Sequence, residues 1–193
     1  MINAVTNILL TGVGGQGILL ASEIICKVMI TSGHDVKKSE VHGMAQRGGS
    51  VNSHVRYGEK VFSPIAGKGD VDILISFEKL ETLRYLDYLK PDGMIIINDT
   101  ELYPPSVNLG EATYPEDILE IVQKQFETVK VVNASDIAVK AGNIRTANTA
   151  MLGVLSMYLD TIGVDVWKNV LRNFFPEKTV KVNLIAFDLG RKA

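Results

Sequence analysis

The 193-residue chain has little of several features that would define a function on their own. It has one cysteine, Cys26, which excludes a disulfide framework, a CxxC zinc site and a cysteine set able to hold an iron–sulfur cluster. Its 20 Lys and Arg residues against 22 Asp and Glu residues provide no basic surface for nucleic acid or an anionic membrane. No stretch approaches the roughly 18 apolar residues that a membrane span needs.

The remaining composition, with 46% hydrophobic and 22% charged residues, is that of a folded protein. At roughly 100 to 200 residues per domain, we expect residues 1–193 to form a single domain. The opening residues MINAVTNILLTG lack a positively charged leader, so the expected location is cytoplasmic.

Short apolar runs alternate with segments of helical spacing, which predicts an α/β fold of three layers, α/β/α, around a mostly parallel sheet. The predicted strands are residues 7–11, 35–41, 71–77, 94–99 and 129–133, and the predicted helices between them are 18–32, 78–89 and 116–126, the last opened by Pro115. Alternating residues 51–57, followed by a turn and 60–63, predict a β-hairpin insertion. The last third is predicted to be helical, in segments 144–162, 164–174 and 180–189.

A glycine-rich turn follows the first predicted strand. Gly12, Gly14 and Gly17 match G-x-G-x-x-G between a strand and a helix, where free N–H groups and the helix dipole suit an anion. Nicotinamide or flavin binding would also need an acidic residue at the end of the second strand, but Asp35 comes before that strand and Glu40 slightly late. The alternative is a turn that only lets helix and strand pack.

A polar segment, EVHGMAQRGGSVNS, runs from Glu40 to Ser53 at the edge where open α/β sheets bind ligands. Arg47 and Gly48-Gly49 resemble an anion site, because guanidinium donors and bare backbone N–H groups converge there. An ordinary ordered loop with a solvated arginine is the alternative.

The sequence contains no catalytic constellation that stands on its own. His42 and His54 lack a third ligand at a recognisable spacing, so we expect structural histidines and no metal site. Ser50 and Ser53 are not set in a G-x-S-x-G elbow, which leaves a hydrolase triad unsupported.

Two segments together, GVGGQGILLAS at 12–22 and SEVHGMAQRGGSVNSHVRYG at 39–58, resemble the gamma-type subunit of the 2-oxoacid:ferredoxin oxidoreductases. The HGMAQRGG sequence is most similar to the small beta subunit of the indolepyruvate branch of this family. Further similar positions near the carboxyl end are Asn148-Thr149-Ala150, Leu152-Gly153, Asn183, Ala186-Phe187 and Gly190.

The resemblance implies a non-catalytic subunit of a thiamine-diphosphate enzyme that oxidatively decarboxylates an aryl pyruvate to an acyl-CoA and passes electrons to ferredoxin. Thiamine diphosphate, Mg²⁺ and 4Fe-4S clusters would then belong to a large partner subunit. A contact between this chain and coenzyme A is a further implication.

The resemblance also gives a set of candidate residues for binding a cofactor or contacting the partner. They are Gly12, Gly14, Gly15, Gln16 and Gly17 in the turn, and Glu40, His42, Gly43, Met44, Gln46, Arg47, Gly48, Gly49 and Ser50 in the loop. Pyruvate, branched-chain and 2-oxoglutarate enzymes of the same family remain open as alternatives. A free-standing nicotinamide oxidoreductase and a binding module without a redox role are alternatives from other classes.

Overall fold

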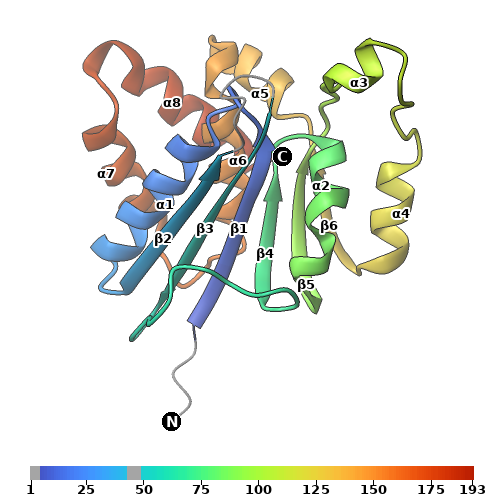
Figure 1. Ribbon diagram of the computed structural model, residues 1–193. Helices are drawn as coiled ribbons and strands as arrows, with labels where there is room; N and C mark the ends of the chain where they lie inside the picture. Colours follow the sequence, from blue (N-terminus) through green and yellow to red (C-terminus); the bar gives the residue numbers. More distant parts are fainter. Residues whose placement is uncertain (1–4, 43–48) are drawn as a thin grey trace.

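The computed structural model describes residues 5–42 and 49–193, with a six-stranded sheet at their centre (Figure 1). Strand order is β2-β3-β1-β4-β5-β6; β1, β4, β5 and β6 pair in parallel, whereas β3 is antiparallel to both of its neighbours. The strands are β1 (Val5–Val13), β2 (Asp35–His42), β3 (Ser50–Gly58), β4 (Val71–Ser76), β5 (Leu89–Asn98) and β6 (Thr128–Val132).

Helices cover both faces of this sheet, which confirms the predicted three-layer α/β/α fold (Figure 1). On one face, here called the α1 face, lie α1 (Ile18–Thr31), α5 (Ala134–Ala141), α6 (Ala147–Leu155), α7 (Val164–Phe174) and α8 (Glu177–Gly190). The opposite α2 face carries α2 (Lys79–Tyr85) and α4 (Ile118–Gln125). Short helical segments are α3 (Pro105–Asn108), η1 (Leu86–Tyr88) and η2 (Ile144–Thr146).

The periodic segments form the elements that their residues predict. In β4 and β5, runs such as MIIIN bury both faces of a central strand, as expected for parallel pairing. Helix α1 ends beside Gly33, which adopts the left-handed conformation at φ 89° and caps the helix. No helix within the described ranges is long and apolar enough to cross a membrane.

The predicted partner of residues 51–57 is wrong. Residues 60–63 form no strand; β3 instead lies between β1 and β2 and pairs with both of them. The segment after β3 crosses the polar side of that strand, where Ala66 N–H donates to Nδ1 of His54 and Arg56 donates to the carbonyls of Ser63 and Ile65. Covering these polar side chains satisfies them without a further strand.

The helical prediction for residues 144–162 is also too long. Residues 144–146 form a 3₁₀ turn that Asn143 caps, and α6 ends at Leu155, where the Ser156 hydroxyl donates to the carbonyl of Gly153. Helix α5 was missed, although Asn133 accepts from the N–H of Asp136 at its start and Gly142 ends it at φ 99°. Helix α4 begins at Ile118, so Pro115 lies before its first turn.

Candidate functional site

The glycine turn lies at the carboxyl end of β1, where it contacts the end of the polar loop. The N–H of Gly14 donates to the carbonyl of Gly49 at 2.9 Å, and Val13 pairs with Ser50 across the two strands. Two segments that are 35 residues apart in sequence therefore share the edge of the sheet at which α/β folds bind ligands.

Two glycines of the turn, Gly12 and Gly17, are accounted for by close packing or by backbone conformation. A Cβ at Gly17 would lie 2.4 Å from Nδ2 of Asn148, and Gly17 has φ 82°. At Gly12 a Cβ would lie 2.7 Å from Oε1 of Gln16 and 2.9 Å from Cβ of Phe77. Close packing of helix, strand and turn thus accounts for two of the three motif glycines without a ligand.

Gln16 holds the turn together with both ends of its amide. Its Oε1 accepts from the N–H of Val13 at 2.7 Å, and its Nε2 donates to the carbonyl of Phe77, after β4, at 2.8 Å. Because both groups of the amide are bonded to the backbone, the side chain acts as a structural brace of the turn.

Helix α1 begins at this turn, and no side chain of the described residues caps its first N–H groups. Gly17 at the N-cap has no side chain, and the first turn contains no acidic residue. The positive end of the helix dipole and the bare N–H groups favour an anion. Gly15 and Gly17 line two hollows here, of about 450 Å³ and about 460 Å³, and Arg145 lines the second.

A third hollow of about 620 Å³, here called the α2 cleft, lies on the other side of the turn. Gly14 and Ser50 form one wall, and Leu102, Tyr103, Pro104 and Pro105 form the opposite wall. Glu78 and Glu81, at the start of α2, lie between the two walls.

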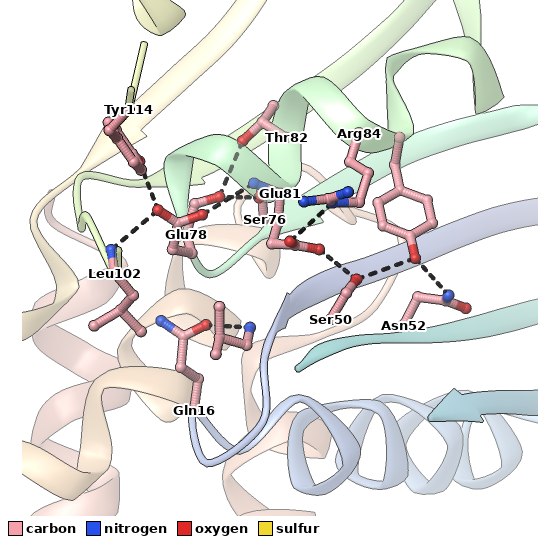
Figure 2. A network of polar contacts seen from close by, with 12 residues as sticks. Gln16, Ser50, Asn52, Ser76, Glu78, Glu81, Thr82, Arg84, Leu102 and Tyr114 are labelled. Carbon is pink, nitrogen blue, oxygen red and sulfur yellow. Dashed lines mark hydrogen bonds and ion pairs between the residues drawn. The ribbon is translucent and has the colours of Figure 1, made fainter. Parts of the chain in front are cut away.

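Glu81 connects α2 to Ser50 (Figure 2). Its side chain is 6% exposed; Oε2 accepts from the Ser50 hydroxyl at 2.5 Å, and Oε1 accepts from Nε of Arg84 at 3.0 Å. The Tyr85 hydroxyl lies 3.3 Å from Oγ of Ser50 and accepts from Nδ2 of Asn52 at 2.8 Å. A hydrogen-bonded chain thus runs from β3 to the carboxylate of Glu81.

Glu78 connects α2 to the opposite wall (Figure 2). It is 1% exposed and caps α2 by accepting from the N–H of Glu81; it also accepts from the N–H of Leu102 and the hydroxyl of Tyr114. Burial, followed by the bond to Glu78, raises the pKa of the Tyr114 phenol, which keeps it a hydrogen-bond donor.

Sequence reasoning missed both carboxylates of α2. Charged side chains are rarely buried, so Glu78 and Glu81 read as the exposed start of a helix. The available signal was the position of Glu78, directly after the apolar strand that ends near Phe77, at the carboxyl edge of the sheet.

The profile of the pyruvate ferredoxin/flavodoxin oxidoreductase family matches residues 7–193. The chain belongs to this family. It is 41% identical over 191 residues to the protein named indolepyruvate oxidoreductase subunit IorB of Pyrococcus horikoshii, covering 97% of this chain and 95% of that relative.

Two solved structures with less than 25% identity share the fold. Subunit PORC of the Thermotoga maritima pyruvate oxidoreductase has a TM-score of 0.74 at 20% identity, over 97% of this chain and 96% of that one. The 2-oxoglutarate:ferredoxin oxidoreductase of Magnetococcus marinus, solved with 2-oxoglutarate, coenzyme A and succinyl-CoA bound, has a TM-score of 0.76 at 23% identity. The match covers 97% of this chain and 30% of that chain.

The geometry of this family member argues against the dinucleotide interpretation of its glycine turn. Because β3 lies between β1 and β2, the end of β2 is about 10 Å from β1, twice the usual strand spacing. Glu40 forms an ion pair with Lys38 at 2.6 Å, and Lys38 also pairs with Glu23 of α1. Asp35, at the opposite end of β2, pairs with Lys37. Neither acid lies where a ribose would require it.

Several candidate residues of the loop lie outside the described residues. They are Gly43, Met44, Gln46, Arg47 and Gly48, and the side chain of His42 is likewise outside them. His54 is 5% exposed, and burial, followed by the nearby Arg56 charge, lowers its pKa. The described residues contain no cluster of three metal-ligating side chains.

Proposed function

We propose that this chain is the small, non-catalytic subunit of a thiamine-diphosphate-dependent complex. The complex oxidatively decarboxylates indolepyruvate or another aryl pyruvate, forms the acyl-CoA and passes the electrons to ferredoxin. The observation that carries this proposal is the 41% identity to an indolepyruvate oxidoreductase subunit across almost the full length of both chains. We further propose that the chain acts as one domain in the cytoplasm.

The division of cofactors follows from the chemistry of the chain. A 4Fe-4S cluster needs four cysteine thiolates, whereas this sequence has only Cys26. Cys26 is 7% exposed in the core of the α1 face, and burial raises the pKa of its thiol to about 11. We therefore assign the clusters to the large partner subunit, through which ferredoxin is reduced, and on the family resemblance we assign thiamine diphosphate and Mg²⁺ to it as well.

The contact surface in this proposal is the glycine turn together with the loop from Glu40 to Ser50. Support comes from the hydrogen bond between Gly14 and Gly49 and from the uncapped start of α1. Bare N–H groups at Gly15 and Gly17 suit a phosphate, so they would hold an anionic part of coenzyme A, which supplies the thiol that accepts the acyl group. The residues of this surface bind and orient; none is assigned a proton or electron transfer.

Co-purification from the native host tests the assignment. We expect a large subunit to be recovered with this chain, together with thiamine diphosphate and iron. The isolated chain should contain no iron and should not reduce a viologen dye with indolepyruvate. Turnover by the isolated chain would contradict a non-catalytic subunit, and recovery without a large partner would favour a separate binding module.

Arg47 tests the contact surface. Arg47→Ala should change the unfolding free energy of the lone chain by no more than about 0.5 kcal/mol, as surface substitutions usually do. Turnover of the reconstituted complex should fall. Arg47→Lys should restore little of it, because an ammonium group cannot form a bidentate fork to a carboxylate or phosphate. If both variants match the wild type in assembly and turnover, the loop is a solvated connection.

A further inference from the structure

The hydrogen bonds around Ser50 fix the direction in which its hydroxyl points. Glu81 accepts and cannot donate as a carboxylate, so the Ser50 proton lies on the 2.5 Å bond to Oε2. Asn52 donates to the Tyr85 oxygen, so the Tyr85 proton is free to point at Oγ of Ser50, 3.3 Å away. Every donor in the chain from Asn52 to Glu81 then points the same way.

Ser50 is left with one lone pair that no described partner uses. Ser50 is partly exposed and lines the α2 cleft beside Gly14, whereas Glu81 and Asn52 are buried. With its proton committed to Glu81, the hydroxyl presents an acceptor to the cleft and no donor. The backbone N–H groups of the neighbouring glycine turn are hydrogen-bond donors. The two sides of this edge of the sheet therefore recognise different groups.

A stability role explains the carboxylate of Glu81 poorly. Burying a carboxylate costs several kcal/mol in desolvation, and its counter-ion Arg84 is 53% exposed, which weakens the attraction. Glu78 already caps α2, so Glu81 is not needed for that purpose. A glutamine or an apolar side chain would fill the position at lower cost.

We propose that Glu81 is a positioning residue that orients the Ser50 hydroxyl, so that Ser50 accepts a hydrogen bond from an N–H or O–H group entering the α2 cleft. The donor comes from the large partner subunit or from coenzyme A. This inference rests on the proposed function, because it needs the carboxyl edge of the sheet to be the contact surface of the complex.

The test uses Ser50→Ala and Glu81→Ala in the reconstituted complex, with Ser50→Thr and Glu81→Gln as conservative partners. Ser50→Ala should lower kcat/KM about three- to tenfold, the range expected for one hydrogen bond, and Ser50→Thr should stay within about twofold of the wild type. Glu81→Gln still accepts from Ser50 and should lose less than Glu81→Ala. The double variant should lower kcat/KM no further than Ser50→Ala does, because Glu81 acts on the contact only through Ser50.

Tyr114→Phe is the matched control. It removes a 2.6 Å bond to the other buried carboxylate of α2 and leaves Ser50 untouched, so it should lower the Tm as the test variants do without lowering kcat/KM. Hydrogen exchange of residues 12–16 and 50–52 in the lone chain gives a readout apart from activity. Exchange there should rise in Glu81→Ala and stay unchanged in Tyr114→Phe.

Two further measurements identify the source of the donor. A weaker Kd for the large subunit at unchanged KM for coenzyme A assigns the donor to the partner, and the reverse assigns it to the coenzyme. If Ser50→Ala leaves both constants unchanged, or if the effects of Ser50→Ala and Glu81→Ala add, the inference is wrong. If Arg47→Ala lowers turnover under the same conditions, the proposed function stands even though the inference about Ser50 and Glu81 fails.

Discussion

The α1 face and the α2 face of the sheet are built from different side chains near their carboxyl ends. On the α1 face Ile8, Leu10, Ile75 and Ile96 meet helices through apolar contacts alone. On the α2 face the middle of the sheet is apolar as well, but the row closest to the edge is polar. That row runs across neighbouring strands through Asn52, Thr11 and Ser76.

The polar row has a cost within the sheet itself, whereas the buried atom of the α1 face that lacks a described partner, Nε1 of Trp167, belongs to a helix. Oγ1 of Thr11 and Oδ1 of Asn52 are buried and have no hydrogen-bond partner among the described residues, and Glu78 and Glu81 are buried carboxylates near them. Buried polar groups that lack partners destabilise a fold, so two of them in one row of the sheet, beside two buried carboxylates, indicate a use other than stability. The α1 face therefore supplies most of the apolar packing, while the α2 face places polar side chains beside the site.

The largest effect should come from the α1 face, at the crossing of α6 and α8. A Cβ at Gly190 would lie 2.1 Å from the carbonyl oxygen of Ala150, a backbone atom that cannot move away alone. We expect Gly190→Ala to lower the free energy of unfolding by about 3 kcal/mol or more, measured by urea denaturation.

Gly163→Ala is the matched control, because a Cβ there meets no atom within 4 Å and the backbone has φ −57°. It should change stability by less than about 1 kcal/mol. Equal losses in the two variants would mean that close backbone packing is not what holds this face.

A smaller effect, of opposite sign, is expected from Thr11 on the α2 face. Thr11→Val removes a buried hydroxyl that has no partner in the described part of the chain, and should raise the free energy of unfolding by up to about 1 kcal/mol. Ser76→Ala removes a hydroxyl that donates to the carbonyl of Glu78 at 2.7 Å, and should lower it by about 1 kcal/mol. If both variants have a lower free energy of unfolding than the wild type, the evidence that part of the polar row lacks hydrogen-bond partners is removed.

The smallest effect at neutral pH should come from His54, also on the α2 face, because its contribution changes only at acidic pH. Because burial lowers its pKa in the folded chain, the unfolded chain binds a proton first as the pH falls below about 6.5. Stability is therefore fully present above that pH and declines below it, by at most about 1.4 kcal/mol per unit. Protonation would also remove the acceptor for the N–H of Ala66.

Chemical denaturation of the wild type and His54→Gln between pH 5 and pH 8 measures the contribution of His54 to the pH dependence of stability. The variant should show a flatter profile below about pH 6.5. Identical slopes would assign the pH dependence to other groups.

Sequence reasoning predicts the parts of the fold that repeat a simple pattern. The continuous apolar runs of β4 and β5 follow from burial on both sides of each strand, and the helical period of α1 follows from burial on one side. The alternation in β3 predicts a strand with one polar side, but contains no information about which strand pairs with it. Two polar side chains of β3, His54 and Arg56, are instead satisfied by the backbone of residues 63–66, which begin where the predicted second strand, 60–63, ends.

The candidate site likewise has one part that the sequence predicts and one part that it does not. The glycine turn was located from its motif, because glycine is required locally by its backbone and its packing. The bond between Glu81 and Ser50 joins residues 31 positions apart, and no local pattern signals it. Long-range polar contacts of this kind need the tertiary structure before they can be assigned.

Turnover of indolepyruvate by the large partner subunit, with and without this chain, measures whether this chain is a required but non-catalytic subunit. With a viologen acceptor and coenzyme A, we predict activity only when both subunits are present, and none from this chain alone. Full activity of the large subunit by itself, with no change on adding this chain, would contradict the account.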